Sequence, residues 1–470
     1  MDKNPNRTEN ALETCYMEGT TTTYTKVPGG NLAEATSSPS LFRVGDVNYL
    51  LPFALVTSLF FIWGLANNMT DTLLAAFSKI MEMTSVQTSF IQMAFYGAYF
   101  CFALPTALFI RRFSYRAGIV TGLALFATGG FLFYPAGEAA SYPFYLLAIY
   151  ILAAGCSILE TTANPFVLAM GPEQTATRRL NLAQSFNPIG SIAGLLISKY
   201  FILSSLASDA SRGEMNAVQL AENRQSELFA VSAPYFVTGS LMLIVMLVFA
   251  FYRMPQIQDR AEGNLRAVVG RLYRNKVYRY GVVAQFFYVG AQICVWSYLI
   301  QYVCAQRGIS PGEASQYSVI SVALFTGARF LFTALMRYIA PARLLLFAST
   351  AAALCTFEVI TGSGMPAIIA LVGISFFMSL MFPTIYGLAL EGIGGDSKFG
   401  ASGLIMSILG GALFPLAQGA IATNFPAFQP ATGTFGENFA LSYVVPLACF
   451  AVVIAYSWFA ARVCNSCLKK

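Results

Sequence analysis

The sequence contains no histidine and few charged residues. Among its 470 residues, 11% are charged and 56% are hydrophobic. A soluble domain carries about 25% charged residues, so this composition excludes an ordinary soluble enzyme. The absence of histidine excludes histidine-based triads, histidine metal sites and histidine proton relays. Any proton chemistry must therefore use aspartate, glutamate, lysine, tyrosine or cysteine.

The nine cysteines are scattered and give no disulfide framework. Cys464 and Cys467 form one close pair, but no βαβ pattern surrounds them, and we interpret them as part of an inert or lipidated tail. No cluster has metal-ligand spacing, and no nucleophile lies beside a base, so we predict no metal site, no cofactor and no enzymatic activity. The net charge of +6 fits the loops of a membrane protein better than a nucleic-acid partner.

Long apolar segments follow one another from Tyr49 onward. A helix needs about 20 apolar residues to cross a bilayer, and none of these segments alternates as a barrel strand would. We therefore predict an all-α membrane protein with twelve transmembrane helices in two six-helix halves. The predicted spans are 48–76, 86–109, 115–135, 142–169, 180–203, 231–252, 277–304, 315–338, 341–360, 366–391, 399–424 and 438–462.

The basic residues predict the orientation of the chain. Of the 28 lysines and arginines, 22 lie in the termini and in the loops that share their side of the membrane. Basic loops stay in the cytoplasm, so we expect both termini there, in a multi-pass protein of the plasma membrane. The predicted parts are a disordered tail (1–46), an N-terminal half (47–252), a cytoplasmic linker (253–276), a C-terminal half (277–463) and a short tail (464–470).

A weak internal repeat supports the division into halves. Thr106-Ala107-Leu108 precedes Arg111, and Thr333-Ala334-Leu335 precedes Arg337 at the corresponding place in the second half. In transporters built from two repeats, the substrate site lies near the middle of the membrane, between them.

Ionisable side chains inside the spans are costly and mark functional candidates. Asp71 follows two amides, and Glu160 shares a helix face with Asn164, four residues later. A buried carboxyl group without a cation favours its neutral form, so Asp71 and Glu160 are candidates to carry a proton. Arg329 fits a functional role or a structural one, whereas Glu358 is better explained as structural.

Two further spans carry polar stripes. Asn181, Gln184 and Asn187 are spaced by three residues, whereas Gln285, Tyr288, Gln292 and Trp296 are spaced by three, four and four. Such stripes can pack helices together or bind a ligand. Amides and carboxyls both donate to and accept from hydroxyls, and aromatic rings pack on sugar C–H faces, so a neutral polyol fits. An anion would need more basic residues than Arg329, and a cationic drug would also fit the acids.

The residues at these positions form motifs that resemble a known family. They are FFIWG at 60–64, NNMTD at 67–71, AFYGAYF at 94–100, LETTANPF at 159–166, GPE at 171–173, RLNLAQSFN at 179–187, AQFFYVGAQ at 284–292 and MFPTI at 381–385. The sequence is similar to the fucose:proton symporter family of the major facilitator superfamily over nearly all of 48–462. Residues 1–46, a stretch around 204–230 and residues 386–391 depart from the family pattern.

The resemblance implies a sugar:proton symporter that works by alternating access. It implies that Asp71 is the protonation site and that Glu160 links sugar binding to proton coupling. It assigns the sugar-facing amides to Asn68, Gln184 and Asn187, with Arg329 and Trp296 in the second half. We expect a monomer in the lipid bilayer whose partners are protons and a neutral monosaccharide, L-fucose or a related hexose.

Three other functions fit the same residues. Carboxylates and amides also coordinate Na⁺, so a sodium-coupled sugar carrier is one of them. A drug:proton antiporter is the second, because the acids would suit a cation. The third is a sugar sensor that does not transport, with the N-terminal tail as its signalling part.

Overall fold

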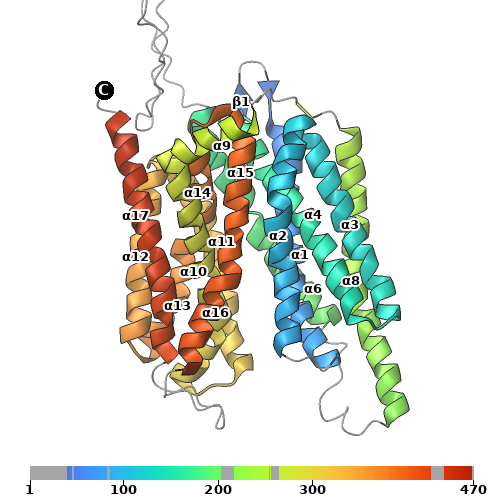
Figure 1. The fold of residues 1–470 in the computed structure, drawn as a ribbon. Helices are drawn as coiled ribbons and strands as arrows, with labels where there is room; N and C mark the ends of the chain where they lie inside the picture. The colour runs from blue at the N-terminus through green and yellow to red at the C-terminus, as the bar shows by residue number, and fades with distance from the viewer. Residues whose placement is uncertain are drawn as a thin grey trace, which may run out of the picture.

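The computed structural model describes residues 40–44, 47–81, 85–202, 216–252, 254–255, 264–424 and 439–467. This part of the chain is helical except for two short antiparallel strands, β1 (Arg43–Val44) and β2 (Val47–Asn48). Two helical bundles stand side by side, and the chain completes the first before it enters the second (Figure 1). Strand β1 and the C-terminal end of the last helix lie at the same end of the molecule (Figure 1).

The first bundle contains α1 (Leu50–Ile80), α2 (Ser85–Arg112), α3 (Tyr115–Glu138), α4 (Tyr142–Ala169), the 3₁₀ turn η1 (Glu173–Thr175), α5 (Ala176–Gln184), α6 (Asn187–Ile197), the π-helical turn η2 (Ser198–Ile202) and α8 (Ala217–Phe251). The helix α9 (Leu265–Arg274) connects it to the second bundle. That bundle contains α10 (Lys276–Arg307), α11 (Pro311–Leu335), α12 (Pro341–Thr361), α13 (Gly364–Met378), α14 (Met381–Leu390), η4 (Gly394–Asp396), α15 (Ser397–Met406), η5 (Ser407–Leu409), α16 (Gly410–Asn424), η6 (Phe439–Tyr443) and α17 (Val444–Cys467).

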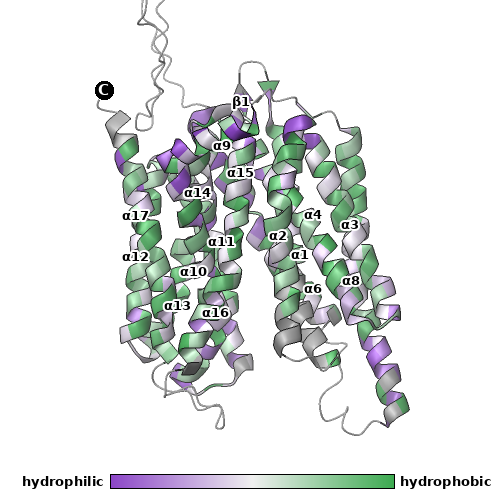
Figure 2. Ribbon diagram, viewed as in Figure 1, coloured by the Kyte–Doolittle hydropathy of each residue, from purple (hydrophilic) through white to green (hydrophobic). Residues whose placement is uncertain are grey.

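Helices occupy all twelve predicted segments. Within the described residues, ten helical segments are long and apolar enough to cross a membrane, and Leu50–Ala66 is a shorter apolar helix. Hydrophobic residues cover the middle of most helices, and hydrophilic residues gather near their ends (Figure 2). This distribution is what a bilayer requires, because backbone polar groups are satisfied within each helix while apolar side chains meet lipid.

We call the end of the molecule that carries Arg111, Arg179, Arg271 and β1 the basic end. There the core of the first half continues into the second, through Leu272, Tyr278, Tyr386 and Phe399. Polar contacts also cross between the halves at this end. Asn181 Nδ2 donates to Thr384 Oγ1 (3.2 Å), the Gly392 amide donates to Glu173 Oε1 (3.1 Å), and Lys398 Nζ lies 4.7 Å from the centre of the Tyr115 ring. The halves are therefore closed against each other at the basic end.

The end of the predicted disordered tail is ordered. Residues 1–39 and 45–46 lie outside the described part, but residues 40–42 lead into β1. Phe42 packs on Phe53 with ring centroids 4.6 Å apart. The fully buried Arg179 donates to the Leu41 carbonyl (3.1 Å) and, with the same guanidinium, to Val167 at the C-terminus of α4 (2.8 Å). A cation at that helix end is favourable, since the last carbonyls carry partial negative charge.

Two further segments are more helical than expected. The predicted linker contains α9, because Leu272 and Val268 bury one side of it and Asn264 caps its first turn. The predicted span 231–252 begins earlier, since α8 starts at Ala217. Asn216 and Gln219 form a capping box there, which satisfies the first backbone amides of α8.

The fifth predicted span is broken in the middle. Its first part, α5, ends at Gln184, and α6 begins at Asn187, next to Pro188. Proline lacks a backbone N–H and disrupts the helical ladder. Helix α6 then packs closely against α1, where a Cβ atom on Gly190 would collide with the Phe61 carbonyl oxygen. The break and the close approach together hold the Gln184–Asn187 corner between the halves.

Candidate functional site

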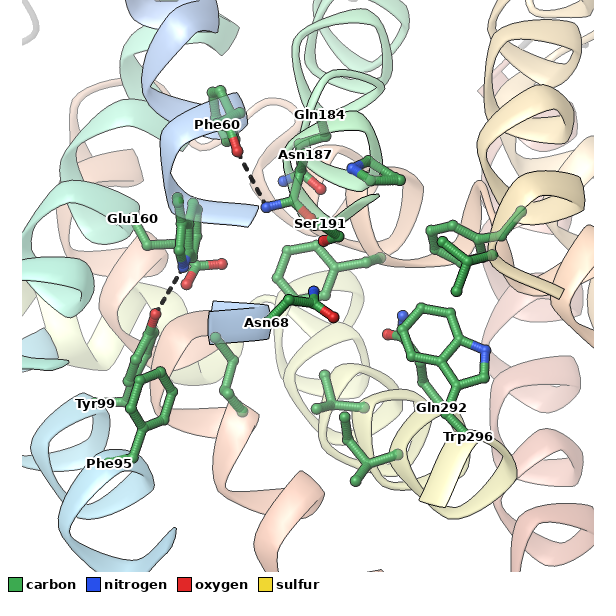
Figure 3. A pocket seen from close by; sticks show the side chains of 18 of the residues that line it. Phe60, Asn68, Phe95, Tyr99, Glu160, Gln184, Asn187, Ser191, Gln292 and Trp296 are labelled. Carbon is green, nitrogen blue, oxygen red and sulfur yellow. Dashed lines mark hydrogen bonds between the residues drawn. The ribbon is translucent and has the colours of Figure 1, made fainter. Parts of the chain in front are cut away.

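A cavity of about 270 Å³ lies between the halves. Small-molecule pockets occupy roughly 300–1,000 Å³, so this volume suits a compact ligand. The first half contributes the lining residues Phe60, Trp63, Asn68, Ile91, Phe95, Tyr96, Tyr99, Glu160, Gln184, Asn187, Pro188 and Ser191. The second half contributes Val289, Gln292, Ile293, Trp296, Val322, Phe325, Arg329, Phe382 and Ile408. Figure 3 shows Asn68, Glu160 and Tyr99 on one side of the cavity and Gln292 and Trp296 on the other.

Glu160 is the acidic residue among the lining side chains. It lies on α4 and is only 4% exposed. Its Oε2 atom is buried, and no hydrogen-bond partner for it is found among the described residues. Burial without a partner penalises a charged carboxylate strongly. Glu160 is thus a group whose charge a proton or a ligand hydroxyl would relieve.

Tyr99 lies on the same side of the cavity as Glu160 (Figure 3), and with Trp63, another lining residue, it forms an aromatic corner. The Trp63 Nε1–H donates to the Tyr99 hydroxyl (2.9 Å). This bond occupies the polar atom of the indole and leaves its ring to line the cavity. An aromatic face offers apolar contact without demanding a hydrogen bond from the ligand.

The broken α5–α6 segment presents two amides to the cavity. Gln184 Nε2 donates to Asn164 Oδ1 (2.9 Å), which ties α5 to α4. Asn187 Nδ2 donates to the Phe60 carbonyl of α1 (3.2 Å; Figure 3). Each amide therefore has a fixed orientation while its side chain still lines the cavity.

The second half places Trp296 opposite these groups. Its Nε1–H donates to Ser375 Oγ (3.1 Å), and Ser375 shares a 2.5 Å hydrogen bond with Ser321. Its ring meets the Phe325 ring edge to face, with centroids 5.0 Å apart. Both cavity tryptophans consequently have their N–H groups bonded within the protein, and both present ring surface to a ligand.

Arg329 is the basic residue among the lining side chains. Its Nε donates to the Ser379 carbonyl (2.5 Å) and its Nη1 to the Gln184 carbonyl (2.9 Å). Its guanidinium carbon lies 4.5 Å from the centre of the Phe325 ring, a cation–π arrangement. Backbone oxygens and an aromatic ring thus hold this cation. Arg271 and Asp396 form an ion pair, but neither residue lines the cavity.

The structure brings most of the predicted site residues to one cavity. Those that line it are Asn68, Glu160, Gln184, Asn187, Gln292, Trp296 and Arg329. Asn164 lies behind Gln184, and Tyr288 is buried with its hydroxyl bonded to the Met378 carbonyl (3.0 Å). Gln285 is fully buried and does not line the cavity. Asp71 lies in α1, but its side chain is outside the described part.

The sequence interpretation missed several lining residues. Trp63, Tyr96 and Tyr99 lie in motifs that supported the family resemblance, yet they were not assigned to the site. The available signal was an aromatic face on an apolar helix. Phe95 and Tyr99 are four residues apart, so they share one face of α2. Ser191 gave no signal, because one serine in an apolar helix is common. Glu358, interpreted as structural, is exposed near the end of α12 and does not line the cavity.

The cavity chemistry suits a small uncharged ligand with hydroxyl groups. Amides and one carboxyl group can donate and accept, and two indole faces offer apolar contact. Within the described residues, no group of three or more Cys, Asp or Glu side chains is placed to hold a metal ion. The arrangement can bind and orient a small ligand. Among the described lining residues, Glu160 is placed where a bound hydroxyl group could hydrogen-bond to its carboxyl group.

Comparisons with known proteins agree with this architecture. Residues 56–415 match the family model described as Major Facilitator Superfamily. The chain is 40% identical over 431 residues to the L-fucose-proton symporter of Haemophilus influenzae, which covers 90% of this chain and 99% of that protein. It is 36% identical to the L-fucose-proton symporter of Escherichia coli, over 88% of this chain and 94% of that one.

More distant relatives include the glucose/galactose transporter of Brucella abortus, at 32% identity over 87% of this chain and 94% of that protein. The structure also resembles the crystal structure of the transporter FucP in the outward conformation. The TM-score is 0.79 at 35% identity, over 88% of this chain and 99% of that one. The chain therefore belongs to the Major Facilitator Superfamily, in the family of the fucose:proton symporters.

Proposed function

We propose that this protein carries a neutral hexose, L-fucose or a close relative, across the membrane together with a proton. One observation carries the proposal: among the described lining residues, the cavity between the halves combines fixed amides and indole faces with the buried acid Glu160 and the buried base Arg329. The names of the two L-fucose-proton symporters support the same substrate and ion. The glucose/galactose relatives support a hexose more broadly.

The sugar would lie between the two indoles. Trp63 and Trp296 offer ring surface to its C–H faces, whereas Gln184, Asn187 and Gln292 are within reach of its hydroxyls. Glu160 would accept a hydroxyl hydrogen bond when ionised and donate one when protonated. The Arg329 guanidinium in the same cavity repels a cation, which disfavours a drug:proton antiporter.

The proton would be carried by Asp71 and Glu160. A charge within the membrane is costly, so an unprotonated carrier resists burying these groups when it closes around them. Protonation removes that cost. The halves can then open at the end where they were closed and close at the opposite end. Sugar at Glu160 would bias the same equilibrium, and this shared bias is what couples the two substrates.

Alternating access would open the cavity to each side in turn. The closed contacts at the basic end, the excess of basic residues there and the likeness to an outward conformation support an orientation with that end in the cytoplasm. The protein would then reside in the plasma membrane. Because one chain encloses the whole cavity, a monomer would suffice for transport.

The test separates binding from coupling. Purified protein in sodium-free liposomes should accumulate labelled L-fucose when the inside is alkaline. The Asp71→Asn variant should exchange sugar but lose accumulation, and Glu160→Ala should bind sugar more weakly in calorimetry.

A sodium requirement would indicate the sodium-coupled alternative. Sugar binding without exchange or uptake would indicate a sensor, and deletion of residues 1–46 would then abolish its signal without changing binding.

A further inference from the structure

The helix α9 lies across the basic end, outside the upright helices of the second half (Figure 1). Arg271 holds it in place through a bidentate ion pair with Asp396, at 2.6 Å for Nε and 2.7 Å for Nη2. Its own residues Val268 and Leu272 are buried against the rest of the protein. This helix is therefore a fixed part of the structure with one face against the protein.

A second apolar stripe of α9 is exposed. Leu265, Val269 and Tyr273 recur every four residues, so they share one face beside the buried stripe. Val269 is 52% exposed and Tyr273 is 68% exposed. Exposed apolar stripes on short amphipathic helices are typical of segments that lie in the membrane interface.

The charges around this stripe are of one sign. Residues 264–280 contain five basic side chains and no acidic one. Arg271 is neutralised by Asp396, whereas Arg266, Arg274 and Lys276 are exposed. A basic cluster beside a membrane surface attracts anionic lipid headgroups.

Four arginine–aromatic pairs lie at the same end of the molecule as α9. In each pair an exposed ring lies at the basic end with a guanidinium near its face. The pairs and their distances to the ring centre are Arg112–Phe113 at 5.7 Å, Arg279–Tyr273 at 5.3 Å, Arg337–Tyr338 at 5.8 Å and Arg462–Trp458 at 3.4 Å. Aromatic belts form where helices leave the hydrocarbon core. Tyr273 belongs both to this group of exposed rings and to α9, so an interface at these rings would also contain the helix.

We propose that α9 is an interfacial helix that binds anionic phospholipids of the leaflet at the basic end. Leu265, Val269 and Tyr273 would enter the acyl boundary, and Arg266, Arg274 and Lys276 would bind headgroup phosphates. Since the Arg271–Asp396 pair ties α9 to the second half, the bound lipid stabilises the connection between the halves. The proposal does not depend on which sugar is carried.

The charge part is tested by thermal unfolding of the full-length protein in nanodiscs. Phosphatidylglycerol added to phosphatidylcholine should raise the unfolding midpoint of the wild type. In the triple variant Arg266→Gln, Arg274→Gln, Lys276→Gln, half-maximal stabilisation should need on the order of one hundredfold more anionic lipid, at about fivefold per basic residue. The control Arg224→Gln, Arg307→Gln removes exposed charges elsewhere and should behave as the wild type. An unchanged lipid response in the triple variant would overturn the proposal.

The apolar part is tested by fluorescence quenching. The sequence has three tryptophans, so Phe can replace Trp63, Trp296 and Trp458, and Tyr273→Trp then provides a single probe on α9. Lipids brominated near the headgroup end of the acyl chain should quench this probe, and aqueous iodide should not. Quenching by iodide with no effect of brominated lipid would place the stripe in water, open to a protein partner, and would contradict the proposal.

Discussion

Arg329 Nη1 donates a 2.9 Å hydrogen bond to the Gln184 carbonyl, and this bond joins the two halves at the cavity. The same guanidinium is fixed in its own half by the Ser379 carbonyl. Gln184 in turn is tied to Asn164 through its side-chain amide. The Arg329 guanidinium thus links the second half to the Gln184–Asn187 corner of the first half, beside the place proposed for the sugar.

Replacing Arg329 by Gln should destabilise the protein by about 2–3 kcal/mol, because two buried carbonyls lose a charged donor. Thermal unfolding in detergent measures this loss, and sugar affinity should fall with it. Arg307→Gln is the matched control, since Arg307 is exposed and donates to Tyr317 at the surface. Equal stability of the two variants would show that the Arg329 bond contributes nothing.

The close packing of α1 against α6 gives a second prediction. Gly190→Ala places a methyl group against the Phe61 carbonyl and should cost about 1–3 kcal/mol, while it displaces Asn187 from the cavity. Gly327→Ala meets open space on α11 and should leave the unfolding midpoint unchanged or slightly higher. If Gly190→Ala proved as stable as Gly327→Ala, the helices would not pack as described.

The closed basic end predicts a coupled pair of substitutions. A Cβ atom on Gly387 would lie 2.6 Å from Thr177 Oγ1 in the other half. Gly387→Ala should therefore separate the halves at the basic end. It should weaken the binding of sugar that enters the cavity from the other end of the molecule. Thr177→Ala, which removes the obstructing hydroxyl and methyl groups, should restore binding in the double variant.

A double-mutant cycle on sugar affinity measures this coupling, expected at about 0.5–3 kcal/mol for contacting residues. Additive effects would mean that Thr177 and Gly387 do not meet. A cysteine introduced in place of Thr384, which lies at the basic end, provides an independent measurement. Gly387→Ala should increase the labelling rate of this cysteine, whereas the double variant should not.

The bond between Trp296 and Ser375 predicts a spectroscopic change. Ser375→Ala leaves the indole N–H without its partner and should weaken sugar binding about fivefold, the worth of one hydrogen bond. Trp296 emission should shift to the red as its N–H meets water, in a protein with Trp63→Phe and Trp458→Phe. Ser402→Ala removes a buried hydroxyl that bonds within its own helix and should change neither property.

The sequence predicted the helices well and the cavity in part. Apolar segments of membrane-spanning length are a strong signal, and the structure has helices in all of them. Intramembrane polar groups such as Glu160, Gln184 and Arg329 also stood out, because their burial in lipid would be costly. Gln285 and Tyr288 gave the same signal, yet both are buried away from the cavity, since one stripe on a helix can face either a ligand or another helix.

Other features depended on contacts that no local pattern encodes. The ordered end of the N-terminal tail requires Arg179, which is 138 residues away from its partner Leu41. The helix α9 is too short for its stability to be read from propensity, and Asp396 fixes it from the second half. The contact between Trp63 and Tyr99 depends on how α1 and α2 are rotated relative to each other, which the sequence of neither helix specifies.

We propose that a proton gradient drives sugar through this cavity by way of Asp71. The most direct measurement compares wild type and Asp71→Asn in sodium-free liposomes, with labelled L-fucose and an inside-alkaline gradient. The wild type should accumulate the sugar until the gradient is collapsed by a protonophore, whereas Asp71→Asn should only equilibrate it. Accumulation by Asp71→Asn equal to that of the wild type would show that Asp71 does not couple the proton to the sugar. Wild-type uptake that does not depend on the gradient would show that the protein is not a proton symporter.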